Sequence, residues 1–290
     1  MSLSWFPLVL IYICTNTVSK IVQKLALKNE EVDSTAFSAV FLFLVGVISA
    51  PFLLFEDVVF SLDIRAWAAV LLSSVLYSAC MVLFYHALKL IEISQVEIVS
   101  TTRSIWSMFL GMIFFQEVLN LSKFIGVFLI FFGIAVIYWE KGQFKGFTKL
   151  HLYTLAYAFL ISCAYALDKY ALNYFSVVMY QVIIYTIPPI FIVIFLPGTF
   201  KKIKPLIKAQ KSTYLILLSC CFQMVSTLAL YRAYQTGGEF SVVGPLTQLT
   251  TVLTIIIGIL VLKERWHLKQ KIIGISLTIL GVVFIKLLQF

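Results

Sequence analysis

Charged residues are scarce in this chain of 290 residues. They make up 12% of the sequence, whereas 61% of it is hydrophobic. In ordinary soluble domains about 25% of the residues are charged and about 45–50% are apolar. This small share of charged residues cannot cover the surface of a soluble fold of this size. The composition therefore excludes an ordinary soluble domain. It suits a lipid bilayer, which a helix of roughly 20 apolar residues can cross.

Residues that carry catalytic or metal chemistry are also few. The three histidines, His86, His151 and His267, are scattered and give no support to a metal site. The five cysteines all fall inside apolar runs without a C-x-x-C pair, which is typical of reduced packing residues. No P-loop, G-x-S-x-G or H-E-x-x-H motif occurs. We therefore expect no cofactor, no metal and no enzyme activity.

Long apolar runs are what the sequence has in abundance. Charged or proline- and glycine-containing stretches separate them, for example at 28–33, 140–149 and 197–211. At roughly 20 residues a span, the runs predict an all-α integral membrane protein with ten transmembrane helices. The predicted spans are 5–23, 34–54, 66–88, 94–115, 122–139, 151–172, 176–197, 212–235, 240–262 and 268–288.

The net charge of +9 does not indicate nucleic-acid binding, because the basic residues lie in loops between the predicted spans. Fifteen of the 22 Lys and Arg residues fall in or directly beside the loops after spans 1, 3, 5, 7 and 9, and four fall on the opposite side. Cytoplasmic loops carry the Lys and Arg excess. We therefore predict a multi-pass protein of the cell (inner or plasma) membrane, with 200–211 in the cytoplasm and both termini outside.

The chain repeats itself with a period of about 145 residues. Residues 111–136 read "GMIFFQEVLNLSKFIGVFLIFFGIAV", and residues 258–283 read "GILVLKERWHLKQKIIGISLTILGVV". Upstream, "FYHAL" at 84–88 matches "LYRAY" at 230–234. The shared positions are Gly111 and Gly258, Glu117 and Glu264, Gly126 and Gly274, Gly133 and Gly281, and Tyr85 and Tyr231.

Each copy of the repeat holds five predicted spans, and five is an odd number. The second copy must therefore enter the membrane from the opposite side, which gives two inverted five-helix repeats, residues 1–145 and 146–290. Secondary transporters are built in this way, with the substrate site near the midplane between the two repeats.

Ten spans and the shared Gly-Glu-Gly-Gly ending of each half resemble the drug/metabolite transporter superfamily, in its EamA-type branch. The resemblance implies a central cavity lined mainly by spans 1, 3, 4, 6, 8 and 9. Relatives export amino acids, drugs and other metabolites, and more distant ones exchange nucleotide-sugars or sugar phosphates. Relatives often carry a proline in spans 4 and 9, where this chain has Ser104 and Thr251.

The expected function is secondary transport of a small polar metabolite, an amino acid or another zwitterionic or anionic solute, by alternating access. Export and exchange both remain open, as do coupling to H⁺ or to a counter-substrate, and a monomer or a homodimer. Alternatives are a nucleotide or nucleotide-sugar exchanger, a lipid-flippase-like protein and a membrane protein that does not transport.

Polar residues inside spans are the best pointers to a site, because each is expensive in hydrocarbon. Arg103 lies nine residues inside span 4, about 13 Å deep at 1.5 Å per residue, so it must face a cavity or a partner in another span. Glu97 is too far around the same helix to be that partner. The candidate substrate-binding residues are Asn16, Tyr85, Glu97, Thr101, Arg103, Trp106, Tyr165, Asp168, Tyr231, Gln248 and Thr251.

Other intramembrane features have structural interpretations. We expect Glu117 and Glu264 to accept backbone N–H bonds from the start of the next helix, and Lys20 and Lys169 to extend from span ends to the interface. The glycine pairs seven residues apart in spans 5 and 10 predict close helix packing.

Overall fold

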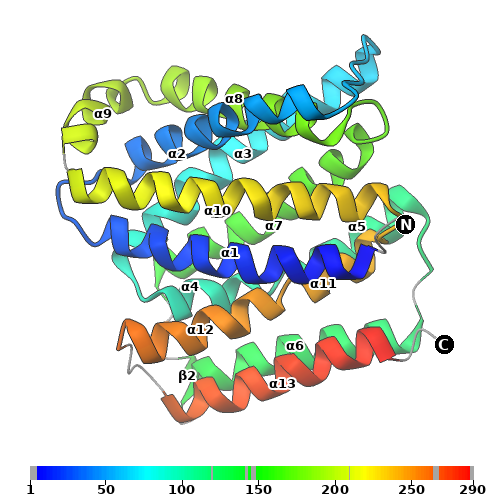
Figure 1. Cartoon of the computed structure of the whole chain (residues 1–290). Coiled ribbons are helices and arrows are strands. Elements are labelled where there is room, and N and C mark those ends of the chain that lie inside the picture. The colour runs from blue at the N-terminus through cyan, green and yellow to red at the C-terminus, as the bar shows by residue number, and fades with distance from the viewer. Residues whose placement is uncertain are drawn as a thin grey trace.

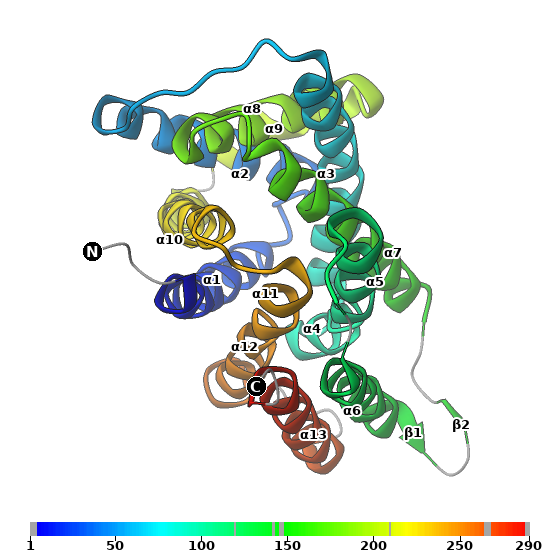
Figure 2. The same cartoon turned by 90° about the vertical axis from the view of Figure 1, so that its right-hand side faces the viewer.

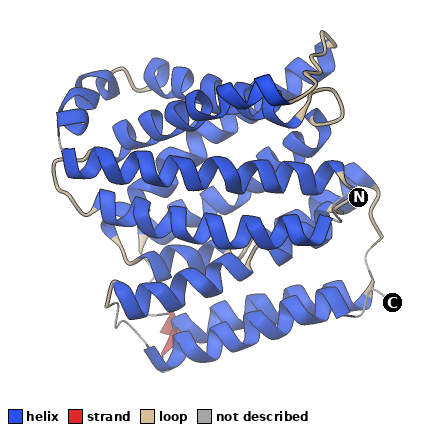
Figure 3. Cartoon of the chain, in the orientation of Figure 1, coloured by secondary structure: helices blue, strands red, loops and turns tan. Residues whose placement is uncertain are grey.

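The computed structural model describes residues 5–118, 120–140, 143–144, 148–208, 210–263 and 268–287, and this part of the chain is almost entirely helical (Figures 1 and 3). Its strands are a two-residue antiparallel pair, β1 (Trp139–Glu140) with β2 (Gln143–Phe144). The helices are α1 (Trp5–Leu27), α2 (Ser34–Ser49), η1 (Ala50–Phe55), α3 (Ile64–Leu90), α4 (Ile93–Ser100), α5 (Arg103–Phe115), α6 (Leu121–Tyr138), α7 (Lys149–Ala171), α8 (Val177–Phe195), α9 (Gly198–Lys208), α10 (Gln210–Gln235), α11 (Phe240–Leu246), α12 (Leu249–Val261) and α13 (Leu268–Leu287).

Local chemistry sets several helix ends. Asp33 caps α2, its carboxylate accepting from the backbone N–H groups of Thr35 and Ala36, and Asp63 caps α3 in the same way. α2 ends at Ser49, and the chain continues as the 3₁₀ helix η1, whose second residue is Pro51. Proline fits there because it lacks the N–H that a further α-helical turn requires.

Two predicted spans are broken helices. Span 4 is α4 and α5, interrupted at Thr101 and Thr102, and span 9 is α11 and α12, interrupted at Thr247 and Gln248. Each break is a 3₁₀-type turn, with i→i−3 bonds such as Ser104 N–H to Thr101 O and Thr251 N–H to Gln248 O. Threonine hydroxyls also donate to the helix carbonyls there, as Thr101 does to Ile98 O at 2.6 Å. Such backbone is tolerated at membrane depth where it is buried in protein or lines a cavity.

The helices form two sets related by an approximate two-fold axis. α1 packs along α10 and α3 packs along α7, while α2 pairs with α8 and α6 with α13. Figure 2 shows α6 and α13 side by side at one end of the molecule. Gly126, Gly133, Gly274 and Gly281 are all buried, which agrees with the expected close packing of these two helices.

Contacts between connecting segments show that the two sets run in opposite directions. The segment after α1 meets α9 and the start of α10, through Asp33–Lys202 at 2.9 Å and Asn29–Ser212 at 3.1 Å. We call this end the Lys202 side. The end of α7 meets the segment after α5, where Lys169 bonds Glu117, and we call that end the Glu117 side. α1 therefore ends where its counterpart α7 begins, as an inverted repeat requires.

By length and composition, eight of the described helical segments can cross a membrane. α6 and α13 contain shorter apolar stretches, Phe124–Gly133 and Ile272–Gly281, so ten transmembrane helices remain a proposal. The predicted loop at 197–211 is largely helical, because α9 occupies Gly198–Lys208. Glu264, the repeat partner of Glu117, lies outside the described residues.

Candidate functional site

A small cavity lies at the centre, between the two sets of helices. Its polar wall carries Asn16, Lys20 and Gln23 of α1, Arg103 of α5 and Gln223 of α10. Its volume is about 30 Å³, room for roughly two water molecules. The aromatic wall is Phe41, Phe84, Tyr85, Tyr157, Tyr165 and Tyr185.

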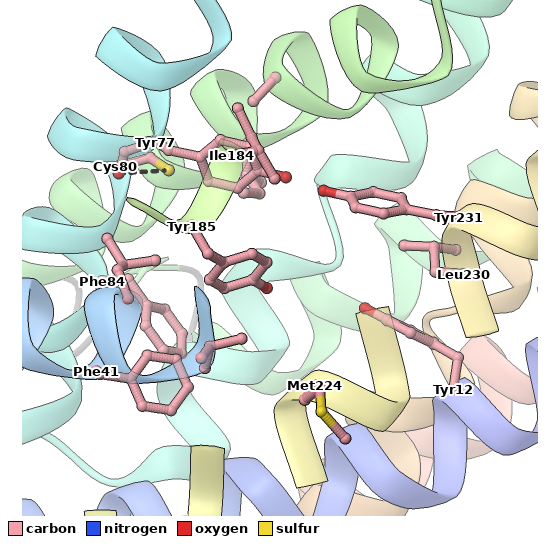
Figure 4. Close-up of a cluster of buried hydrophobic side chains, with 14 of the residues drawn as sticks. Tyr12, Phe41, Tyr77, Cys80, Phe84, Ile184, Tyr185, Met224, Leu230 and Tyr231 are labelled. Atoms are coloured by element: carbon pink, nitrogen blue, oxygen red, sulfur yellow. Dashed lines mark hydrogen bonds between the residues drawn. The ribbon is translucent and has the colours of Figure 1, made fainter. Parts of the chain in front are cut away.

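Tyr12 of α1 and Tyr185 of α8 line this space, and Figure 4 shows their hydroxyl ends turned toward the same region. The Tyr185 hydroxyl lies 2.8 Å from the Thr227 hydroxyl. The cavity therefore combines flat aromatic surface with hydroxyl groups that can donate or accept hydrogen bonds.

Arg103 is the first residue of α5, directly after the break in span 4. Its side chain is buried at 3% exposure. With the Gln248 amide oriented so that both groups have partners, its oxygen accepts from Arg103 Nε and Nη2, each at 3.0 Å. Nη2 also lies 3.4 Å from Thr247 Oγ1, and the guanidinium carbon lies 5.7 Å from the centre of the Tyr165 ring. Among the described residues, the hydrogen-bond partners of Arg103 are thus neutral, and Glu97, which is paired with Lys20, acts on it only electrostatically.

Lys20 of α1 and Glu97 of α4, both in the first half, form a buried ion pair beside the cavity. Lys20 Nζ lies 2.8 Å from Glu97 Oε2, with side-chain exposures of 8% and 1%, and Thr251 Oγ1 donates to the same oxygen at 3.2 Å. The expectation that Lys20 extends to the interface was wrong, because its ammonium is neutralised inside the protein.

Asp168 occupies a separate, fully buried cage behind the cavity wall. Ser73 Oγ and Tyr180 OH donate to Oδ1 at 2.8 and 2.6 Å, and Tyr77 OH and Tyr231 OH donate to Oδ2 at 2.6 and 3.0 Å. The four hydroxyls come from α3, α8 and α10. They satisfy the carboxylate without a cation, which is unusual for a buried charge.

The mirror position in the other half holds a neutral residue. The alignment of "TVSK" at 17–20 with "ALDK" at 166–169 places Ser19 opposite Asp168. Ser19 Oγ donates to Ser219 O at 2.8 Å and lies 3.3 Å from Gln223 Oε1. The cage of Asp168 therefore has a counterpart on α1 and α10 that carries no charge.

Glu117 joins the two halves on the Glu117 side. Its carboxylate accepts from the backbone N–H groups of Phe240 and Ser241, both at 2.7 Å, and pairs with Lys169 at 2.8 Å. Burial raises the pKa of this carboxyl, but the bonds from Lys169 and Ser241 outweigh burial and hold the pKa below its usual range. Glu117 thus caps a helix as expected, but that helix is α11 of the other half rather than the next helix, α6.

Ten of the eleven predicted site residues fall into four groups. Asn16, Tyr85, Arg103 and Tyr165 line the cavity, and Glu97, Gln248 and Thr251 contact the charged groups on its wall. Asp168 and Tyr231 belong to the hydroxyl cage. The hydroxyl of Thr101 bonds Ile98 O in the helix break.

Trp106 lies outside this site. It is 38% exposed and packs edge-on against Phe159, with ring centroids 4.9 Å apart. The buried face of α5 contains Ser104, and two residues further on the helix has turned by about 200°. Trp106 therefore faces away from the cavity.

Several lining residues were missed by the sequence analysis. Gln23 is buried and Gln223 is half-buried, and both are amides inside helices rich in apolar residues. Polar side chains are costly in hydrocarbon, so these two positions were a usable signal in the sequence. Tyr12, Tyr157 and Tyr185 gave no such signal, because a tyrosine in a span is also an ordinary packing residue.

The sequence profile of the EamA-like transporter family matches residues 3–139 and again residues 148–287. The chain belongs to the EamA-like transporter family. It is thus a multi-pass membrane protein of a family made of transporters. A solved structure, titled "Crystal structure of protein", has a TM-score of 0.64 at 14% identity and covers 96% of each chain, which shows a shared fold. No curated protein matches the chain.

Proposed function

We propose that this EamA-like protein is a secondary transporter that carries a small anionic or zwitterionic metabolite through the central cavity by alternating access. The observation that carries the proposal is Arg103, a buried guanidinium on the cavity wall whose described hydrogen-bond partners are neutral and whose nearby carboxylate, Glu97, is already paired with Lys20. A buried charge without a counter-ion is costly, and an anionic substrate supplies that counter-ion.

The charge balance of the cavity supports an anion. Lys20 is neutralised by Glu97 at 2.8 Å, so this pair adds no net charge to the wall. Arg103 then leaves one positive charge facing the space. A guanidinium binds a carboxylate or a phosphate with two parallel hydrogen bonds, and the Tyr165 ring, 5.7 Å from its carbon, makes a cation–π contact with it.

The size of the cavity supports movement between states. At about 30 Å³ it holds roughly two waters and is too small for a metabolite. The two sets of helices must therefore separate around it before a substrate binds. The Glu117 side is tied across the halves by Glu56, which accepts from Val178 N–H at 2.9 Å, and by the Glu117–Lys169 pair, whose side chains are 8% and 19% exposed. On the Lys202 side the Asp33–Lys202 pair also crosses the halves, but its side chains are 31% and 52% exposed, so it is the weaker tie. We infer that the cavity opens on the Lys202 side from this state.

The membrane arrangement completes the proposal. We propose that α6 and α13 also cross the bilayer, giving ten spans in two five-helix units, residues 1–145 and 146–290. The basic segments on the Lys202 side, α9 among them, support a cytoplasmic position for that side. The cavity would then load from the cytoplasm of the cell membrane, which suits an exporter or an exchanger.

Counterflow in proteoliposomes tests the function. Amino acids, amines, nucleotides and sugar phosphates form the panel, first ranked by thermal stabilisation of the purified protein. We expect carboxylates or phosphates, but not plain amines, to stabilise and exchange. Arg103→Gln should abolish both effects, whereas Arg65→Gln, at an arginine whose side chain is 78% exposed, should change neither. Exchange of amines alone, or full activity of Arg103→Gln, would refute an anion site at Arg103.

A further inference from the structure

The buried carboxyl of Asp168 has no role in the anion site described above. It is 0% exposed and does not line the cavity, and its described partners are the hydroxyls of Ser73, Tyr77, Tyr180 and Tyr231. A purely structural polar contact at this position does not require a carboxylate, because the mirror residue in the other half, Ser19, makes its contact with a hydroxyl.

We propose that Asp168 is a proton-binding site, which takes up and releases one proton as the two halves of the transporter move. The inference rests on the proposed transport function and adds its coupling ion. The carboxylate gains the proton on one oxygen, and a neighbouring hydroxyl turns from donor to acceptor. No other bond forms or breaks, and the proton returns to water when the cage opens.

The chemistry of the cage allows both states of the carboxyl. Every partner is a hydroxyl, which can donate to a carboxylate or accept from a carboxylic acid. Ser73 also has a second acceptor, Ala164 O, at 3.4 Å. The Lys20–Glu97 pair lacks this property, because protonation of Glu97 would leave an ammonium without its counter-ion.

The surroundings of Asp168 contain no charged contact in the described part of the chain. α3 presents Ser73, Tyr77 and the buried thiol of Cys80, α8 presents Tyr180, and α10 presents Tyr231. Lys169, the residue after Asp168 on α7, is paired with Glu117 instead, at 2.8 Å. The proton is therefore the cation that compensates Asp168.

The distances favour a proton over a metal ion. The hydroxyl oxygens of Tyr77 and Tyr180 lie 2.6 Å from the carboxylate oxygens, so they are bonded directly to it. A sodium ion between them would break these bonds. The cage is also contacted by both halves, since α3 belongs to the first and α7, α8 and α10 to the second. Separation of the halves therefore changes the number of donors that reach the carboxyl.

Infrared difference spectroscopy tests proton binding without a transported substrate. The purified protein is reconstituted in phosphatidylcholine vesicles and titrated from about pH 4 to about pH 9. We expect a protonated-carboxyl band that titrates in the wild type and in the control Asp57→Asn, at an exposed carboxyl outside the cage, but is lost in Asp168→Asn. Tyr180→Phe keeps the carboxyl and removes one donor to the charged form, so the midpoint should move up by about one pH unit. No titrating band, a band that survives Asp168→Asn, or a band that follows NaCl rather than pH would overturn the proposal.

Transport then tests coupling. With a compound that the wild type exchanges, we expect a pH gradient to drive accumulation in the wild type, and Asp168→Asn to keep counterflow but lose accumulation. Accumulation by Asp168→Asn equal to that of the wild type would overturn proton coupling while leaving the transport function standing. If no compound of the panel is exchanged, the transport function fails, and the infrared titration alone decides whether Asp168 binds a proton.

Discussion

Removal of one member of the Lys20–Glu97 pair should destabilise the protein more than removal of both. The side chains are 8% and 1% exposed and their charged atoms are 2.8 Å apart, so Lys20→Met leaves a carboxylate buried without its cation. Breaking a buried pair in this way costs about 3–5 kcal/mol. The double variant, Lys20→Met with Glu97→Gln, buries no charge at this place, so we expect it to lose less stability than either single variant.

The measurement is the free energy of unfolding of the detergent-purified variants, followed by tryptophan fluorescence during SDS titration. Lys202→Met is the matched control. Its pair with Asp33 has the same kind of contact, 2.9 Å, but side-chain exposures of 52% and 31%, and exposed pairs contribute about 0–1 kcal/mol. If Lys20→Met is no more destabilising than Lys202→Met, or if the double variant is worse than both single variants, the reasoning about this pair is refuted.

Three further outcomes follow from the described contacts. Arg103→Lys should keep the melting temperature but weaken substrate binding roughly ten- to a hundred-fold, about 1.5–3 kcal/mol, because an ammonium lacks the two-pronged geometry; unchanged affinity would remove Arg103 from the site. The pKa of Glu117 lies below its usual range, so its contribution to stability is present above about pH 4.3 and is lost as the pH falls through the lowered pKa; Glu117→Gln should melt lower near neutral pH and approach the wild type in acid. A Cβ at Gly244 would lie 2.7 Å from a side chain of α5, whereas a Cβ at Gly198 meets nothing within 4 Å, so Gly244→Ala should cost about 1–3 kcal/mol and Gly198→Ala should not.

The apolar runs made the helices predictable, because hydrocarbon forces every backbone group of a span into helical hydrogen bonds. The internal repeat made their two-fold arrangement predictable as well. The breaks after Ser100 and Leu246 were not predicted, since no proline marks the first of them and threonine is compatible with both helix and turn. α9 was missed because its apolar content is too low to suggest a span.

The candidate site was predicted where burial of charge gave a signal. Arg103 had to face a cavity or a partner, and it lines the cavity. The partners of Glu97 and Asp168 lie on other helices, at positions that helical periodicity within one span cannot reveal. Trp106 shows the converse limit, because being close in sequence to Arg103 says nothing about which side of the helix a residue occupies.

The mirror relation between Ser19 and Asp168 has a consequence for the energies of the transport cycle. In a molecule made of two inverted copies, opening to one side of the membrane gives each copy the shape that the other copy has when the molecule opens to the opposite side. Two identical copies would make these end states equal in energy. A position that carries a hydroxyl in one copy and a titratable carboxyl in the other removes that equality, and it does so by an amount that depends on the pH of each compartment.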